Sequence, residues 1–135
     1  MPDSPPVVAI VNTSPDIVDM LRVVFEQAGL VVVSAFTHDI REGVVDIDAF
    51  VRQHEPRAIV YDIAPPYGPN WRLFEHVRTR PAVRHCKFVL TSTNPAHVRE
   101  LAGSNQQVYE IVGKPFDLDQ IVQATREAVR ARATR

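Results

Sequence analysis

The sequence is poor in features that several protein classes require. Its 135 residues include a single cysteine, Cys86, so one chain cannot hold an internal disulfide, and this fits a reducing compartment. No apolar run approaches the roughly 20 residues of a membrane-spanning helix. The net charge of -1 gives no overall attraction to nucleic acid or to an anionic membrane. Composition therefore predicts an ordinary cytoplasmic globular protein without a nucleic-acid or membrane partner.

Motifs of common enzyme classes are missing as well. Residues 12–15, which follow the first apolar run, contain no glycine, and this argues against a nucleotide-binding Rossmann domain. No serine has the nucleophile-elbow context of a hydrolase. The five histidines lack metal-ligand spacing, and Cys86 is expected to be a small buried hydrophobe. We therefore predict that the protein is not an enzyme.

The length of the chain suits one domain with a single substantial core. Residues 1–6 contain an acid and three prolines and lack a basic segment, so we expect a disordered lead-in rather than a signal peptide. The domain is expected over residues 7–131, with residues 132–135 as a short tail. No separate output domain is expected, because the chain ends soon after its last helical pattern.

What the sequence does contain is a regular alternation of apolar runs and amphipathic segments. Apolar runs predict strands at residues 7–11, 30–35, 57–62, 87–91 and 107–112. Helical spacing follows each run, and residues 36–46 are expected to be a loop before a short helix capped by Asp46 or Asp48. Strands that alternate with helices predict an α/β fold, a five-stranded parallel sheet of flavodoxin-like order 2-1-3-4-5 covered on both faces.

Two helices and two aromatic residues receive specific expectations. Asn70 is expected to cap a helix that buries Leu73, Phe74 and Val77, and Asp117 to cap the last helix. That last helix is expected to bury Leu118, Ile121, Val122 and Val129, with Thr125 as the polar residue of the stripe. Trp71 lies off the expected inward stripe. With Tyr67 it is expected either to cover the site or contact a partner, or to pack partly against a neighbouring loop.

Polar residues stand at the ends of four predicted strands. Asn12, Asp62, Thr91 and Lys114 follow apolar runs one, three, four and five. Parallel strands end at one edge of the sheet, which is where open α/β folds place their ligand sites. We therefore expect these side chains to converge, with Asp62 as the floor of the functional site.

The same residues carry a resemblance to a known family. From Val7 to about Arg130 the chain resembles the receiver domain of two-component response regulators. The resemblance implies that Asp62 is the phospho-acceptor, with Pro66 four residues after it, and that Thr91 and Lys114 contact the phosphoryl group. It also implies a cis peptide bond before Pro115, in a motif that continues to Phe116.

Three departures from the family bear on the expected chemistry. Asn12 and Thr13 stand where the family has the acidic pair that holds Mg²⁺, and Ile111 stands where it has a switching aromatic residue. The segment around residues 37–46 is longer than usual. Asn12 offers one neutral oxygen and Thr13 a hydroxyl, both poor substitutes for carboxylates. Any metal would be held by Asp62 and Asn12, so we expect weak Mg²⁺ binding at most and a direct Asp62–Lys114 ion pair.

The resulting expectation is a stand-alone, atypical receiver-like domain that acts through protein contacts, with weak or no Mg²⁺-dependent phosphorylation. An active phospho-accepting single-domain response regulator and a flavodoxin-like small-molecule binder stay open as alternatives. The expected partner is a bacterial signalling protein such as a histidine kinase. A homodimer would use the family's helix 4–strand 5–helix 5 face, here about residues 95–130.

Overall fold

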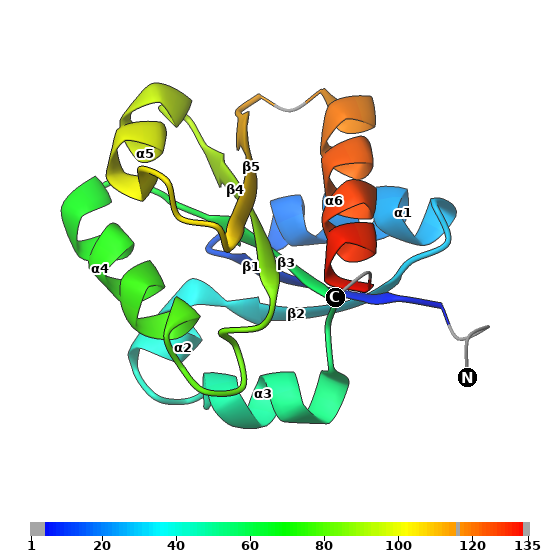
Figure 1. Cartoon of the computed structure of the whole chain (residues 1–135), viewed down its shortest axis with the longest axis horizontal. Helices are drawn as coiled ribbons and strands as arrows, with labels where there is room; N and C mark the ends of the chain where they lie inside the picture. Colours follow the sequence, from blue (N-terminus) through cyan, green and yellow to red (C-terminus); the bar gives the residue numbers. More distant parts are fainter. Residues whose placement is uncertain (1–4, 116, 134–135) are drawn as a thin grey trace.

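The computed structural model describes residues 5–115 and 117–133, the last two as backbone only. Five parallel strands form one sheet in the order β2-β1-β3-β4-β5, as predicted (Figure 1). The strands are β1 (Val7–Asn12), β2 (Val31–Phe36), β3 (Ala58–Asp62), β4 (Lys87–Ser92) and β5 (Val108–Gly113). Because β1, β3 and β4 are buried on both faces, they read in the sequence as continuous apolar runs.

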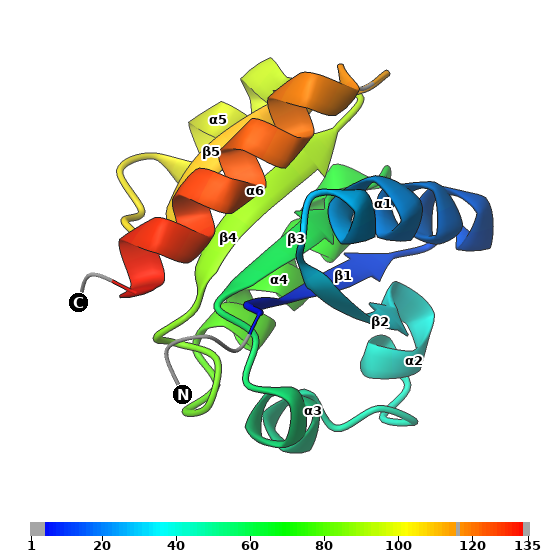
Figure 2. The same ribbon diagram turned by 90° about the vertical axis from the view of Figure 1, so that its right-hand side faces the viewer.

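Helices cover both faces of this sheet (Figures 1 and 2). They are α1 (Pro15–Gln27), α2 (Thr37–Arg41), α3 (Ile47–His54), α4 (Tyr67–Arg78), α5 (Pro95–Ala102) and α6 (Leu118–Ala133). Alternate strand residues point to opposite faces, so Val8 and Ile10 pack with α1 and α6, whereas Ala9 and Val11 pack with the other helices. The sheet thus divides the core into two apolar layers.

Several predicted helix caps are present. Ser14 accepts a hydrogen bond from the Ile17 amide and Asn94 accepts one from the His97 amide, each followed by a proline at the first helical position. Asp117 accepts from two amides at the start of α6. Asp46, rather than Asp48, caps α3. Across the described part of the chain, no helix combines the length and apolar character that crossing a membrane requires.

The predicted loop over residues 36–46 is wrong in its first half, because Thr37–Arg41 forms α2. Five residues are too few to show helical periodicity, and no side chain caps this helix. The prediction for Asn70 is also wrong, because α4 begins at Tyr67 after Pro66, so Asn70 lies inside the helix. The Asn70 side chain instead donates from Nδ2 to the Ala64 carbonyl oxygen at 2.6 Å, and so fixes the loop after β3.

Two side chains differ in burial from the prediction. Trp71 is only 8% exposed, packs on Phe74 and donates from Nε1 to Glu75 at 3.0 Å. Trp71, Phe74 and Val77, spaced three residues apart, form the buried stripe of α4, and Leu73 is only partly buried. Leu118, expected in the core, is 40% exposed at the first position of α6.

Candidate functional site

The carboxyl edge of the sheet brings the expected polar residues together. Asp62 ends β3, and Thr91 is its register partner on β4. Asn12 ends the neighbouring strand β1. Lys114 directly follows β5, where its amide donates to the Ser92 carbonyl oxygen at 2.9 Å. All four residues are therefore held by backbone ladders rather than by loop conformation alone.

Asp62 is the centre of this cluster. Its Oδ1 accepts a hydrogen bond from the Thr91 hydroxyl at 2.6 Å and lies 2.9 Å from the Lys114 ammonium nitrogen. The carboxylate is 1% exposed, whereas the Lys114 side chain, at 22%, still reaches the surface. The expected ion pair between Asp62 and Lys114 is thus present, and charge-assisted bonds of this kind are the strong ones in proteins.

The second carboxylate oxygen has a different environment. Asp62 Oδ2 is buried and has no hydrogen-bond partner among the residues that the structure describes. Leaving a buried acceptor without a donor costs about 1–3 kcal/mol, and more for a charged group. The site therefore has one saturated oxygen and one oxygen that is buried without a protein donor.

The neighbouring residues are a poor match for a divalent cation. Asn12 Oδ1 accepts from the Ser14 amide at 3.0 Å, so its one neutral oxygen already stabilises the entry to α1. Thr13 is exposed. Within residues 5–115 and 117–133, no three His, Cys, Asp or Glu side chains lie close enough to share a metal ion. Of the two candidate ligands, only Asp62 has an oxygen not already bonded.

The other positions taken from the resemblance lie close by. Ile111 is partly buried on β5, against the layer formed with α4 and α5. The Lys114–Pro115 peptide bond is cis, as the resemblance implies, and so is the Pro65–Pro66 bond. Phe116, the third residue of the motif, lies outside the described residues.

Tyr61, just before Asp62, points into the layer opposite α1 and α6 and packs on Phe74 and Phe88. Burial and the Asp62 carboxylate raise the pKa of its phenol, which stays protonated, while the Arg41 guanidinium acts in the opposite direction. Its hydroxyl has no partner among the described residues. Tyr61 is therefore a neutral core residue rather than an acid or a base of the site.

Sequence reasoning missed the contacts that fix the loop between β3 and α4. Arg41 from α2 donates to Asn70 Oδ1, and Asn70 holds the Ala64 carbonyl. On the other side, the Tyr67 hydroxyl lies 2.8 Å from Thr93 Oγ1 in the loop after β4. The nearness of Tyr67 to Asp62 in the sequence is the only signal that pointed to it.

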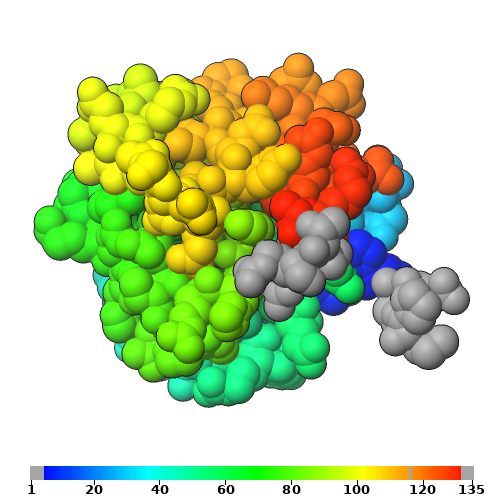
Figure 3. Space-filling model, viewed as in Figure 1, coloured from blue at the N-terminus to red at the C-terminus, as the bar shows by residue number. Residues whose placement is uncertain are grey.

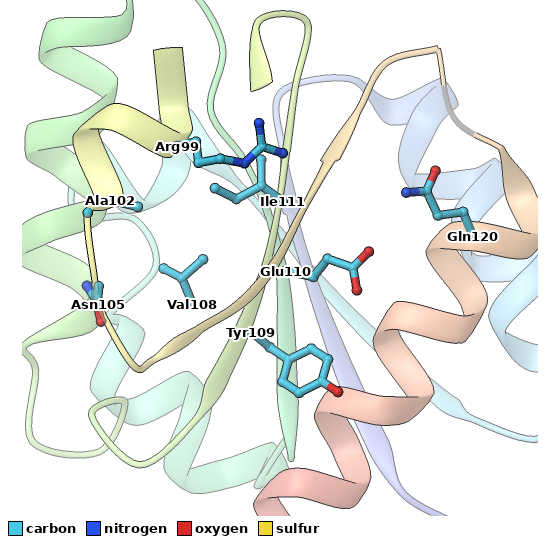
Figure 4. Close-up of a pocket in the computed structure, with 9 residues that line it drawn as sticks. Arg99, Ala102, Asn105, Val108, Tyr109, Glu110, Ile111 and Gln120 are labelled. Atoms are coloured by element: carbon cyan, nitrogen blue, oxygen red, sulfur yellow. The ribbon is translucent and has the colours of Figure 1, made fainter. Parts of the chain in front are cut away.

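The face formed by α5, β5 and α6 corresponds to the expected contact surface and is continuous in the space-filling view (Figure 3). It contains an open pocket of about 390 Å³ (Figure 4). Exposed Tyr109 lies at its rim and donates to Glu127 at 3.2 Å. The pocket is lined by Arg99, Ala102, Gly103, Asn105, Val108, Tyr109, Glu110, Ile111 and Gln120.

No protein-family model matches the sequence, and no curated protein matches it either. Several solved structures, however, are similar to this chain. A sensor protein from Polaromonas sp. JS666 has a TM-score of 0.75 at 19% identity, covering 94% of this chain and 98% of its own. A CheY-like response regulator receiver domain protein from Methanospirillum hungatei JF-1 has a TM-score of 0.75 at 18% sequence identity, and the match covers 97% of this chain and 98% of that chain.

The chemotaxis response regulator CheY4 of Vibrio cholerae gives a TM-score of 0.71 at 18% identity, with 93% of this chain and 99% of that chain covered. The likeness extends over nearly the whole chain in all three comparisons, although sequence identity is low. The chain therefore has the CheY-like fold of response-regulator receiver domains.

Proposed function

We propose that the protein is a receiver-like module of two-component-type signalling that works through protein contacts, with weak or no Mg²⁺-dependent phosphorylation of Asp62. It acts as a binding protein rather than an enzyme, in the cytoplasm. The observation that carries this proposal is the direct Asp62–Lys114 ion pair in a receiver fold whose first strand ends at Asn12 and is followed by Thr13.

Electrostatics support the proposal. Transfer of a phosphoryl group to a carboxylate brings two anions together, and receiver-type chemistry depends on a bridging cation to do so. Each carboxylate missing from a site at about 4 Å removes roughly 8 kcal/mol of raw attraction for a dication at an effective dielectric constant near 20. The Asp62 charge is already balanced by Lys114.

Access to the carboxylate points in the same direction. A nucleophile must present a free oxygen to its substrate. Asp62 Oδ1 is held by Thr91 and Lys114, and Oδ2 is buried. A phosphoryl donor therefore reaches Asp62 only after the site opens, which adds a cost to a reaction already short of a cation.

The α5–β5–α6 face is the proposed contact surface. It offers exposed Tyr109 and Leu101 beside charged Arg99 and Glu110, a mixture that suits a reversible protein interface. The partner is a signalling protein such as a histidine kinase, or a second copy of this chain.

The test is the intact mass of the protein after incubation with acetyl phosphate and Mg²⁺, beside the variants Asp62→Ala and Thr13→Asp. We expect no adduct on the native chain and a phosphoryl adduct on Thr13→Asp. Thr13→Asn is the matched control, since it changes the same position without adding a charge. An adduct on the native chain that disappears in Asp62→Ala would refute the proposal.

That refuting outcome would establish the alternative, an active phospho-accepting receiver. The specific observation in its favour is that Asp62, Thr91 and Lys114 are already assembled, with Asp62 Oδ2 unbonded in the described part of the chain. The two proposals thus differ in whether Asn12 and Thr13 supply enough cation binding for the reaction and in whether Asp62 is accessible to a phosphoryl donor.

A further inference from the structure

The segment that follows β3 and the segment that follows β4 lie on either side of Asp62, and hydrogen bonds join them at two places. At the base, Asp62 accepts from the Thr91 hydroxyl at 2.6 Å, and the Ile63 amide donates to the Thr91 carbonyl oxygen at 2.8 Å. At the tips, the Tyr67 and Thr93 hydroxyls are hydrogen-bonded at 2.8 Å. The end of β3, the start of α4 and the end of β4 therefore form a closed ring of contacts with Asp62 in it.

Tyr67 also reaches the first turn of α5. Its ring packs nearly perpendicular to the His97 imidazole, with a centroid distance of 5.4 Å. The amide of that same His97 donates to Asn94, the cap residue of α5, at 3.2 Å. One side chain thus contacts both the loop that leads from Thr91 and the helix that this loop begins.

The start of α5 also packs closely against β5. A methyl group on Gly113 would lie 3.1 Å from Pro95 Cγ, tighter than ordinary van der Waals contact. Gly113 directly precedes Lys114, the cation paired with Asp62. A displacement of α5 is therefore felt at β5, and the reverse also holds.

We propose that Tyr67 is a positioning residue that couples the charge state of Asp62 to the N-terminus of α5, and through it to the α5–β5–α6 face. Ile111 on β5 has neither a ring nor a hydroxyl to make such a link. Tyr67, at the start of α4, supplies both. This inference rests on the proposed function, because it assigns an input to the contact face named there.

The coupling is measured by amide hydrogen exchange at residues 97–102. Asp62→Asn keeps the shape of the side chain but removes the charge that Lys114 balances. In the native chain we expect this change to shift exchange in α5 by on the order of fivefold, at the lower end of ordinary coupling between sites. In a Tyr67→Phe background, which lacks only the hydroxyl, we expect most of the shift to be lost.

Tyr109→Phe is the matched control, because it removes a hydroxyl bonded to Glu127 on the same side of the sheet as α6. The response to Asp62→Asn should persist there. Thr93→Ala removes the other end of the Tyr67 bond and should reproduce Tyr67→Phe. Exchange protection in β1 and β3 reports whether each variant is folded.

Two results would overturn the inference. One is an Asp62→Asn response of equal size with and without the Tyr67 hydroxyl. The other is no response in α5 of the native chain. Neither depends on phosphorylation, so this test can fail while the intact-mass result stands, and the converse is equally possible.

Discussion

Asp48 shows how a single carboxylate can tie two distant segments together. It lies buried on α3, where Oδ1 accepts from the Ala82 amide at 3.0 Å and Oδ2 accepts from Arg80 at 2.8 Å. The Ala82 hydrogen bond holds the pKa of Asp48 below its ordinary value of 3.8; burial opposes this, and Arg80 adds to it. The folded protein therefore favours the ionised form.

This shift predicts how stability depends on pH. A lowered carboxyl pKa contributes stability that is present above the unfolded value and lost as pH falls through the folded one. At neutral pH we expect Asp48→Asn to cost about 2 kcal/mol of unfolding free energy, since the Arg80 bonds are lost. The deficit should shrink below pH 3.8.

Urea unfolding at a series of pH values measures this difference. Asp46→Asn is the control, because asparagine caps a helix about as well as aspartate and the Asp46 side chain is exposed. A deficit of the same size at pH 7 and at pH 3 would contradict the argument.

The Asp62–Lys114 pair makes a second prediction at this scale. Lys114→Met leaves a carboxylate that is 1% exposed without its cation, and breaking a buried pair from one side costs on the order of 3–5 kcal/mol. The partial exposure of Lys114 reduces that figure. We expect Lys114→Met to cost about 3 kcal/mol, and Asp62→Asn combined with it to cost less.

Chemical denaturation of the two single variants and the double variant forms the cycle that tests this. Lys87→Met is the control, because that lysine donates to the Gln106 carbonyl at the surface and neutralises no buried charge. Additive losses in the double variant would mean that Lys114 does not stabilise Asp62.

Among the elements, β2 is the edge strand nearest α1. The Val31 backbone N–H donates to the Pro6 carbonyl oxygen, toward β1. In a parallel ladder the backbone N–H and C=O groups of the alternate residues Val32, Ser34 and Phe36 therefore point away from β1, to the open edge of the sheet. Arg22 on α1 donates to the Val32 carbonyl oxygen at 2.9 Å and to the Ser34 hydroxyl at 3.0 Å. Its guanidinium therefore occupies an edge that another strand could otherwise pair with.

Removing this cover should have two effects. We expect Arg22→Ala to lose about 1 kcal/mol of stability and to increase concentration-dependent self-association. Analytical ultracentrifugation measures the association, and Arg72→Ala, at an exposed position of α4 away from the proposed contact face, is the control. Unchanged sedimentation of Arg22→Ala at every concentration would show that the edge is protected in another way.

The element scale also explains which predictions succeeded. Buried parallel strands are recognisable in the sequence as apolar runs. The order of the strands, and the convergence of Asp62, Thr91 and Lys114 at one edge of the sheet, could therefore be predicted from these runs and from the connection rules of α/β folds. Helix α2 and the start of α4 could not. One is too short for periodicity, and the other begins after two prolines with no side-chain cap.

The missed contacts have a common physical origin. Tyr67 meets Thr93, and Arg41 meets Asn70, across loops whose backbone conformation no periodic pattern specifies. Trp71 was misplaced for a different reason: Leu73, Phe74 and Val77 were taken as the inward stripe, whereas the i, i+3 spacing of Trp71, Phe74 and Val77 also fits one face of the helix. Strand-end chemistry was predictable, and loop-borne chemistry was not.

At the scale of the whole molecule, the sheet separates two sets of helices with different tasks. On one side α1 and α6 complete a core layer, and Arg22 of α1 also covers the edge strand β2 by hydrogen-bonding to it. On the other side α4 and α5 carry the contacts around Asp62, and α5 belongs to the proposed contact face. Changes at the site and changes at the edge strand are therefore expected to act separately.

The lysine that neutralises Asp62 from within the fold has a consequence for the cell. A receiver that needs Mg²⁺ and a phosphoryl group responds to their supply. This site, in which Lys114 pairs with Asp62 and Asn12 and Thr13 replace the acidic pair, is expected not to. On the proposed function, the number of copies of this protein sets how many partner molecules it occupies, and the charge state of Asp62 acts on each copy through α5. Synthesis and turnover would then set the strength of its effect.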